Sequence, residues 1–145
     1  MRGRLFFPRL KLDSYIKFLV DTGADATCLH PPDSTNMVVP YGDLEKPQDL
    51  EGIGGNAPYS YEPGLLLLAD HRLTRGFRIE IAILNIDALD IKDEDDIPQI
   101  PSLLGRDILQ NGWLRFDPPN GRVEFTVKRA DLTSRAGLDD DIPFY

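Results

Sequence analysis

Residues 15–29 read YIKFLVDTGADATCL, and this stretch decides the fold. An apolar run typical of a buried strand ends at Asp21, which is followed by a small hydroxyl residue, Thr22, and by Gly23, which permits a tight turn. This order of residue types predicts a carboxylate held rigidly at the end of a strand, at the edge of a cavity. The Asp-Thr-Gly sequence occurs only once in the chain. Because a catalytic carboxylate of this kind normally works with a second one, the motif also bears on the oligomeric state.

The composition is typical of a single globular domain. The chain has 145 residues, of which 41% are hydrophobic, and this length is enough to bury a real core. No apolar run approaches the roughly 20 residues that span a bilayer. Residues 1–7 are basic and then apolar, like the start of a signal peptide, but the apolar stretch ends at Pro8, too soon for one. The net charge of −8 argues against nucleic-acid and membrane partners, which bind basic surfaces. We expect a soluble, cytoplasmic protein.

The residues that usually bind metals or act as nucleophiles are few. Cys28 is the only cysteine, so the chain has no internal disulfide and no cysteine-based metal site, and we interpret Cys28 as a buried core residue. His30 and His71 stand in no recognisable triad or metal motif. The acidic residues 93–96 lack the spacing of a calcium loop and predict a solvated loop. We therefore expect no metal and no other cofactor.

Short apolar segments between Gly, Pro, Asn and Asp residues predict an all-β barrel or sandwich. Residues 5–12 and 15–20 are expected to form a hairpin around the Asp-Ser pair at positions 13–14, a good tight turn. Residues 65–68 (LLLL) predict a strand buried on both faces. Residues 77–83 alternate apolar and polar side chains, as a half-buried strand does.

The C-terminal third predicts one helix and one more hairpin. Residues 105–112 (GRDILQNG) predict the single real helix of the chain, a short one. Residues 114–127 predict a final hairpin around a turn rich in Pro and Gly. The polar residues that follow predict a mobile or loosely docked tail. We therefore expect a domain of residues 1–127 and a tail of residues 128–145.

Three segments together resemble the retropepsin family, the homodimeric aspartic proteases of retroviruses and their cellular and bacterial relatives. They are residues 18–27 (FLVDTGADAT), residues 52–55 (GIGG) and residues 103–109 (LLGRDIL), and they follow one another in the order that the family has. The resemblance spans residues 5–127. It implies a closed, all-β acid-protease barrel with one short C-terminal helix, and an aspartic endopeptidase that binds a peptide or protein substrate in extended form.

The chemistry of carboxylates agrees with this resemblance. Hydrolysis of a peptide bond needs one ionised carboxylate to activate water and one protonated carboxyl group to polarise the carbonyl. Two carboxyl groups held close together share a proton and titrate as a coupled pair, as aspartic proteases illustrate. This chain supplies one such Asp and is less than half as long as a two-lobed, pepsin-like chain. We therefore expect a twofold homodimer that brings two Asp21 side chains together.

The resemblance also assigns roles within the catalytic loop. Asp21 would be the catalytic carboxylate, Thr22 would hydrogen-bond across the dimer axis, and Gly23 would allow the turn and offer its carbonyl to substrate. Asp25 would contact the substrate main chain. Arg106 would pair with Asp25 and tie the helix to the loop.

Further residues are expected to contact substrate. Gly52, Ile53 and Gly54 would form the tip of a flap that closes over an extended peptide, and Leu103 would help line an apolar side-chain pocket. Ala24 stands where many aspartic proteases have a Ser or Thr that stabilises the ionised carboxylate. Since alanine offers no hydroxyl, we expect activity at weakly acidic rather than strongly acidic pH.

Two other interpretations remain open. The chain could keep the retropepsin fold as a catalytically weak or inactive dimeric binding or assembly module, because a fold does not fix a function. The apolar residues 142–145 (IPFY), carried on a polar tether, could fold back into the cleft and limit activity. A phosphate-binding role for residues 52–55 is disfavoured, because no helix start follows them.

Overall fold

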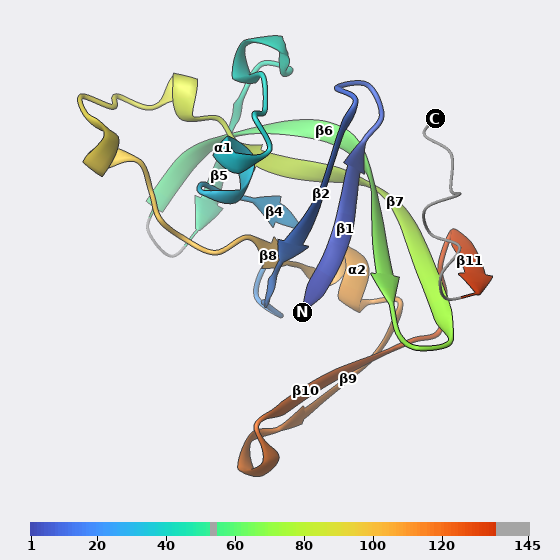
Figure 1. The fold of residues 1–145 in the computed structure, drawn as a ribbon. Coiled ribbons are helices and arrows are strands. Elements are labelled where there is room, and N and C mark those ends of the chain that lie inside the picture. The colour runs from blue at the N-terminus through green and yellow to red at the C-terminus, as the bar shows by residue number, and fades with distance from the viewer. Residues whose placement is uncertain (53–54, 136–145) are drawn as a thin grey trace.

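The computed structural model describes residues 1–52 and 55–135 and consists mainly of strands (Figure 1), which confirms the predicted all-β architecture. In chain order the strands are β1 (Arg2–Phe7), β2 (Leu12–Lys17), β3 (Leu19–Val20), β4 (Cys28–Leu29), β5 (Gln48–Gly52), β6 (Gly55–Ala69), β7 (Leu73–Leu84), β8 (Leu103–Leu104), β9 (Gly112–Asp117), β10 (Arg122–Val127) and β11 (Leu132–Arg135). The helical elements of the same residues are α1 (Asp33–Asn36), α2 (Arg106–Leu109) and the single-turn 3-10 segments η1 (Tyr41–Asp43), η2 (Ile86–Ala88), η3 (Glu94–Asp96) and η4 (Pro118–Asn120).

In the described part of the chain, nine strands form one curled sheet. Its main path runs β2–β1–β6–β7–β4–β8–β3, while β5 extends β6 and β11 pairs with β7. The long strands β6 and β7 are antiparallel and carry most of the other pairings (Figure 1). The short strands β3, β4 and β8 meet at the far end of this path, where β3 runs parallel to β8 and β4 runs parallel to β7. Strands β9 and β10 form a separate two-stranded sheet.

Buried apolar side chains explain why β6 and β7 lie at the centre of the sheet. Residues 65–68 are all buried, as their continuous apolar sequence predicted. Leu66 packs into the main core, while Leu65 and Leu67 face the other way and form a smaller cluster with Phe6. On β7 the predicted alternation holds from Phe77 to residue 80. Residues 81–84 are then buried without interruption, because β7 lies there between β6 and β4.

The first hairpin forms as predicted, but its turn does not lie at positions 13–14. The turn is at residues 8–11, where the Lys11 N–H donates to the Pro8 carbonyl at 3.3 Å and Lys11 has a φ of 56°. Asp13 lies within β2 opposite Phe6, and its carboxylate accepts hydrogen bonds from Arg4. This cross-strand pairing outweighs the local tendency of Asp and Ser to form a turn.

The second strand of this hairpin also ends earlier than predicted. Residues 15–20 were expected to form one strand, but Phe18 separates β2 from β3. The Phe18 N–H donates to the Met1 carbonyl at 2.7 Å, while the Met1 amino group donates to the Phe18 carbonyl at 2.7 Å. The next residue, Leu19, already donates to the Ser102 carbonyl near β8 at 2.8 Å. The chain therefore changes pairing partner at Phe18 and brings β3 to the candidate site.

Helices are short. The predicted C-terminal helix is present as α2, and α1 is a second helix that the sequence did not predict; it starts directly after Pro32, a residue that a helix start tolerates. Among the described residues, no helix has both the length and the apolar character needed to cross a membrane. Part of the expected loose tail is ordered, since β11 pairs with β7 from Leu132, opposite Gly76, to Arg135, opposite Leu73.

Candidate active site

The candidate catalytic carboxylate lies where β3 ends. The Asp21 N–H donates to the Leu104 carbonyl on β8 at 3.0 Å, which continues the β3–β8 pairing by one residue. The chain then turns, because the Ala24 N–H donates to the Asp21 carbonyl at 3.2 Å and the Gly23 N–H donates to Asp21 Oδ1 at 2.9 Å. A Cβ at position 23 would lie 3.2 Å from that oxygen, so the turn favours glycine. The backbone of its own loop thus orients the Asp21 carboxylate.

A buried tie joins this loop to α2. Thr27 is fully buried; its Oγ1 donates to Asp107 Oδ1 at 2.7 Å, and its N–H donates to Asp107 Oδ2 at 2.9 Å. The Gly105 N–H donates to Thr27 Oγ1 at 3.1 Å, and the Ile108 N–H donates to Asp107 Oδ1 at 2.9 Å. We call this network the Thr27–Asp107 tie. Because both carboxylate oxygens are used, it fixes the start of the helix against the loop.

Close backbone packing strengthens the same junction. The Arg106 N–H donates to the Ala24 carbonyl at 2.8 Å. At position 105 a Cβ would lie 2.6 Å from the carbonyl carbon and oxygen of Ala26, a distance that no side chain tolerates. Gly105 therefore permits the helix start to approach the loop this closely.

Arg106 and Asp25 form an ion pair at the surface, beside the catalytic loop. The Arg106 side chain is 57% exposed and that of Asp25 is 86% exposed. Solvent screens such a pair, so its contribution to stability is small compared with that of the buried tie. The pairing itself was expected from the sequence, while the role of Asp25 towards substrate remains a prediction.

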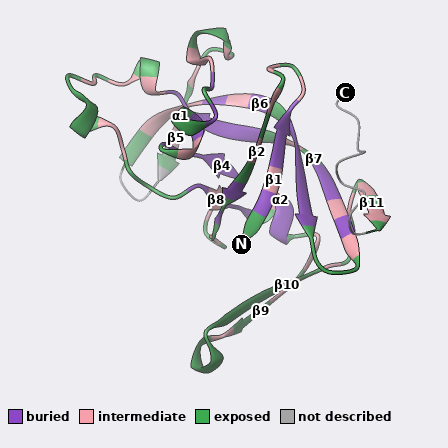
Figure 2. Ribbon diagram, in the orientation of Figure 1, coloured by how far each residue is buried: buried purple, intermediate pink, exposed green. Residues whose placement is uncertain are grey.

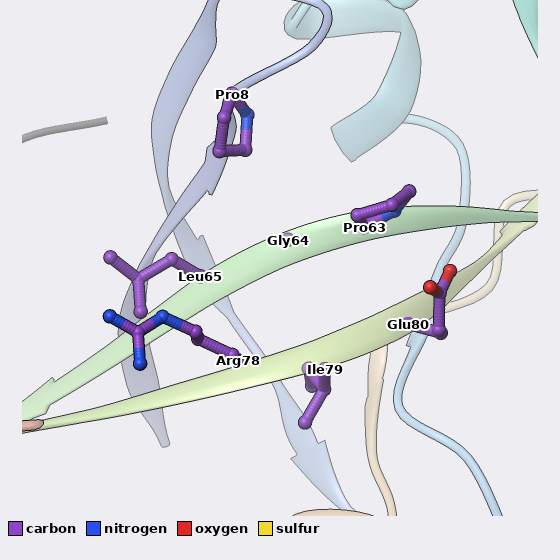
Figure 3. A pocket seen from close by; sticks show the side chains of 7 residues that line it. All are labelled: Pro8, Pro63, Gly64, Leu65, Arg78, Ile79 and Glu80. Carbon is purple, nitrogen blue, oxygen red and sulfur yellow. The ribbon is translucent and has the colours of Figure 1, made fainter. Parts of the chain in front are cut away.

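A hollow of about 620 Å³ opens beside the loop. The exposed residue Thr22 and the Asp25–Arg106 pair line it together with Leu114 of β9. A separate hollow of about 270 Å³ lies over β6 and β7 (Figure 3), and no residue of the catalytic loop lines it. In residues 1–52 and 55–135, no three His, Cys, Asp or Glu side chains are grouped so that they could hold a metal ion.

The expected substrate-binding residues outside the catalytic loop lie on β8 and on the β5–β6 hairpin. Leu103 is half-buried on β8, where it pairs with Leu19 on one side and with Cys28 on the other. Strands β5 and β6 form the hairpin expected for a flap, with Gly52 opposite Gly55. The other two predicted flap residues, Ile53 and Gly54, lie outside the described residues.

A buried histidine connects the base of this hairpin to the loop region. The His30 Nδ1 atom lies 2.7 Å from the Pro101 carbonyl, which can only accept, so Nδ1 carries the proton and Nε2 accepts from the Tyr59 hydroxyl on β6, also at 2.7 Å. Burial lowers the pKa of His30, and burial raises the pKa of Tyr59 to about 12. The His30 N–H donates to Ser102 Oγ, which donates to Asp33. His30 is therefore a neutral structural residue.

Cys28 is a core residue, as the sequence indicated. It is 8% exposed, and burial, together with the charges of Asp107 and Asp21, raises its pKa to about 12. A thiol with this pKa is protonated at neutral pH and is a poor nucleophile. The Asp21 carboxylate thus remains the candidate for chemistry in this region.

The sequence placed Gly105 and Asp107 in the predicted helix of residues 105–112 and Thr27 in the segment 18–27, but it gave none of the three a role of its own. Thr27 is a hydroxyl residue at the start of the buried segment 27–31, and such a residue needs a hydrogen-bond partner. Gly105 occupies the position before the helix, where a capping side chain is more usual. These two signals could have indicated the tie, but neither of them names the partner.

The chain belongs to the retroviral aspartyl protease family, because the model of that family matches residues 6–115. This match, together with the curled sheet of strands, confirms the predicted retropepsin-like fold, and it supports aspartic protease function in general. Members of the family generally act as dimers on peptide substrates. A comparison with curated proteins found no match to the chain.

Proposed function

We propose that this protein is an aspartic endopeptidase whose active site contains two Asp21 carboxylates, one from each chain of a homodimer. The observation that carries this proposal is the turn at the end of β3, in which the Gly23 N–H orients the Asp21 side chain. An Asp on a loop fixed by the Thr27–Asp107 tie has the rigidity that a paired carboxylate needs. One chain contributes a single carboxylate of this kind, so a second copy completes the site.

The reaction then needs no group beyond the two carboxylates and one water. The ionised carboxylate takes a proton from water as the water oxygen attacks the carbonyl carbon, and the protonated carboxyl group hydrogen-bonds to the carbonyl oxygen. When the tetrahedral intermediate collapses, the carbon–nitrogen bond breaks and the leaving nitrogen takes a proton from the carboxyl pair. The pair thus returns to its shared single proton.

The substrate would bind as an extended strand beneath the β5–β6 hairpin, which would act as a flap. Main-chain hydrogen bonds to Asp25 and to the flap would hold the peptide, and Leu103 would help form an apolar pocket. The glycines at positions 52 and 55 favour this role because they permit the dihedral angles of a tight tip; Gly55 has a φ of 99°.

The substitution Asp21→Asn tests the proposal. It keeps the shape of the side chain but removes its acid–base function, so cleavage of casein or of a peptide library should fall at least about a hundredfold while the dimer stays folded. Asp90→Asn, an exposed carboxylate in the loop after η2, is the matched control and should leave cleavage unchanged.

The assay is run between pH 4 and pH 7, with and without pepstatin. Retained cleavage in the Asp21→Asn protein would refute the proposal. A folded dimer that is inert with every substrate over this pH range would favour the alternative of a binding or assembly module.

A further inference from the structure

The first strands of this acidic chain are basic. Residues 1–20 contain five Lys or Arg and one Asp, a net charge of +4, and the −8 of the whole chain leaves −12 for residues 21–145. In the fold, most of the first 20 residues form β1 and β2, at one end of the sheet path. A charge divided in this way between two parts of one domain points to an anionic partner for the basic part.

Strand β2 offers a free edge. Within residues 1–52 and 55–135 it pairs with β1 alone, so no strand lies along its other side (Figure 1). Its residues alternate between exposed and more covered positions (Figure 2), and the exposed ones are Asp13, Tyr15 and Lys17. An exposed edge of this kind can accept a further strand from another chain.

The register of β1 and β2 shows which backbone groups face this edge. Met1 and Phe18 exchange two hydrogen bonds, from the Phe18 N–H to the Met1 carbonyl and from the Met1 amino group to the Phe18 carbonyl, both at 2.7 Å. Hydrogen-bonded and non-hydrogen-bonded pairs alternate along antiparallel strands, so the three exposed residues of β2 belong to the second kind. Their N–H and carbonyl groups therefore point away from β1. In the described part of the chain, the Tyr15 carbonyl accepts a long bond of 3.4 Å from the Ser14 hydroxyl, and the three N–H groups have no partner.

The side chains of the same residues form a basic and aromatic surface. Arg2 lies directly opposite Lys17, and Arg4 lies directly opposite Tyr15. Arg4 donates to both carboxylate oxygens of Asp13, at 3.1 and 2.8 Å, so this pair balances its own charge. The guanidinium carbon of Arg2 lies 4.6 Å from the centre of the Tyr15 ring. The ring therefore holds the Arg2 guanidinium against the sheet, ready to bind a carboxylate.

Arg2 and Lys17 carry charge that the described residues do not balance. Neither side chain forms a salt bridge within residues 1–52 and 55–135. Like charges directly opposite each other on neighbouring strands are destabilising. Charged side chains on an edge strand can discourage aggregation, but that role does not require two like charges to face each other. A carboxylate from another molecule would relieve the repulsion between Arg2 and Lys17.

We call the set of Arg2, Asp13, Tyr15 and Lys17 the basic edge. We propose that the basic edge binds an extended, acidic segment of a partner protein, which adds to β2 as a further strand. The backbone of this segment exchanges hydrogen bonds with the outward-facing groups of β2. Because the side chains of a strand alternate between its two faces, acidic residues at every second position lie on the same face as Arg2 and Lys17.

A polypeptide fits this edge better than a nucleic acid or a lipid surface does. Those polyanions carry negative charge but no alternating row of N–H and carbonyl groups that could pair with β2. The −12 of residues 21–145 also repels a long polyanion, whereas a short acidic segment contacts the basic edge alone. Binding at the basic edge does not depend on the proposed function, because no residue of the catalytic loop takes part in it.

Fluorescence anisotropy of a labelled peptide measures this binding to the full chain. The peptide has about eight residues that alternate Glu and Val, and its control has Gln in place of every Glu. Saturating pepstatin is present to block the proposed substrate cleft. We expect the Kd of the Glu peptide to be at least about tenfold lower than that of the Gln peptide, and to rise with salt.

Lys17→Glu tests the protein side of the contact. It removes one of two facing positive charges, so the fold is retained, and the Kd of the Glu peptide should rise at least about fivefold. Lys92→Glu, at an exposed lysine between η2 and η3, is the matched control. It changes the net charge of the chain by the same amount and should leave the Kd close to that of wild type.

Amide hydrogen exchange, measured by NMR, tests the addition of a strand. With the Glu peptide bound, the amides of Asp13, Tyr15 and Lys17 should exchange at least about tenfold more slowly. The amides of Ser14 and Ile16 face β1 and should change little.

Four results would overturn the proposal. Equal Kd values for the Glu and Gln peptides, or for Lys17→Glu and Lys92→Glu, would show that charge at this edge does not select the partner. Unchanged exchange of the outward-facing amides would show that no strand is added. A labelled single-stranded oligonucleotide that binds as tightly as the Glu peptide, and less tightly to Lys17→Glu, would assign the edge to nucleic acid. A lower mass of Lys17→Glu than of wild type in sedimentation velocity without peptide would mean that a second copy of the chain covers the edge.

Discussion

Among single residues, Thr27 links the catalytic loop to the start of α2. Its buried hydroxyl group both donates to Asp107 and accepts from the Gly105 N–H. Thr27→Val keeps the shape but leaves Asp107 Oδ1 and the Gly105 N–H without this partner. We expect the free energy of unfolding to fall by about 1–3 kcal/mol, the cost of unsatisfied buried polar groups, and peptide cleavage to fall with it.

Urea unfolding at pH 7.5 measures this change, and Thr126→Val, at an exposed position of β10, is the matched control. The control should leave the midpoint close to that of wild type. If both substitutions shift the midpoint equally, the Thr27–Asp107 tie does not hold the loop.

The difference between Asp21 and Thr27 shows what sequence alone can reveal at this scale. The Asp21 turn could be predicted because the hydrogen bonds that close it, from the Gly23 and Ala24 N–H groups to Asp21, join residues within the motif. The Thr27–Asp107 tie joins residues that are 80 positions apart, and neither residue type is unusual where it stands. Such a tie can be found only when the fold has brought the two segments together.

At the scale of elements, β11 is part of the folded sheet although its sequence is polar. Leu132 packs on the small cluster of Phe6, Leu65 and Leu67, on the face of β6 turned away from the main core. Leu132→Ala removes this packing. Because Leu132 is only half-buried, we expect a loss of about 1–2 kcal/mol of unfolding free energy, below the range for a fully buried leucine.

Thermal or urea unfolding checks this prediction, and Thr133→Ala, the exposed neighbour on the same strand, provides the comparison. A Leu132→Ala protein as stable as the Thr133→Ala protein would show that β11 docks without contributing to stability.

The elements that the sequence did not predict depend on contacts between strands, which local sequence patterns do not contain. The turn lies at residues 8–11 and not at positions 13–14, because Asp13 pairs with Arg4 across the strands. The turn propensity of Asp and Ser takes no account of such a contact. Strand β11 was expected to be loose because its apolar content is low, yet the free edge of β7 supplies its hydrogen bonds. Residues 65–68 of β6 and 77–83 of β7 were predicted as strands, because their burial sets the pattern of apolar side chains.

At the scale of the whole molecule, the stability of the fold depends on pH through one buried histidine. His30 is buried and neutral, and burial lowers its pKa from the ordinary value of 6.5, although the Pro101 carbonyl and the Asp33 charge act in the opposite direction. As the pH falls through 6.5, the unfolded chain takes up a proton at His30 before the folded chain does. The free energy of unfolding therefore falls as the pH drops below 6.5, and the contribution of neutral His30 is complete above it.

The substitution His30→Gln tests this pH dependence through its slope. Losing the hydrogen bonds to Pro101 and Tyr59 lowers the stability of the variant at pH 8, but the variant has no proton to gain at this position. Between pH 8 and pH 5.5 the unfolding free energy of wild type should therefore fall more steeply than that of His30→Gln, in urea titrations at fixed ionic strength. His71→Gln, at an exposed histidine, should keep the wild-type slope. If the unfolding free energies of wild type and His30→Gln fall equally steeply with pH, His30 takes up its proton without destabilising the fold. Weakly acidic pH would then not weaken the base of the β5–β6 hairpin.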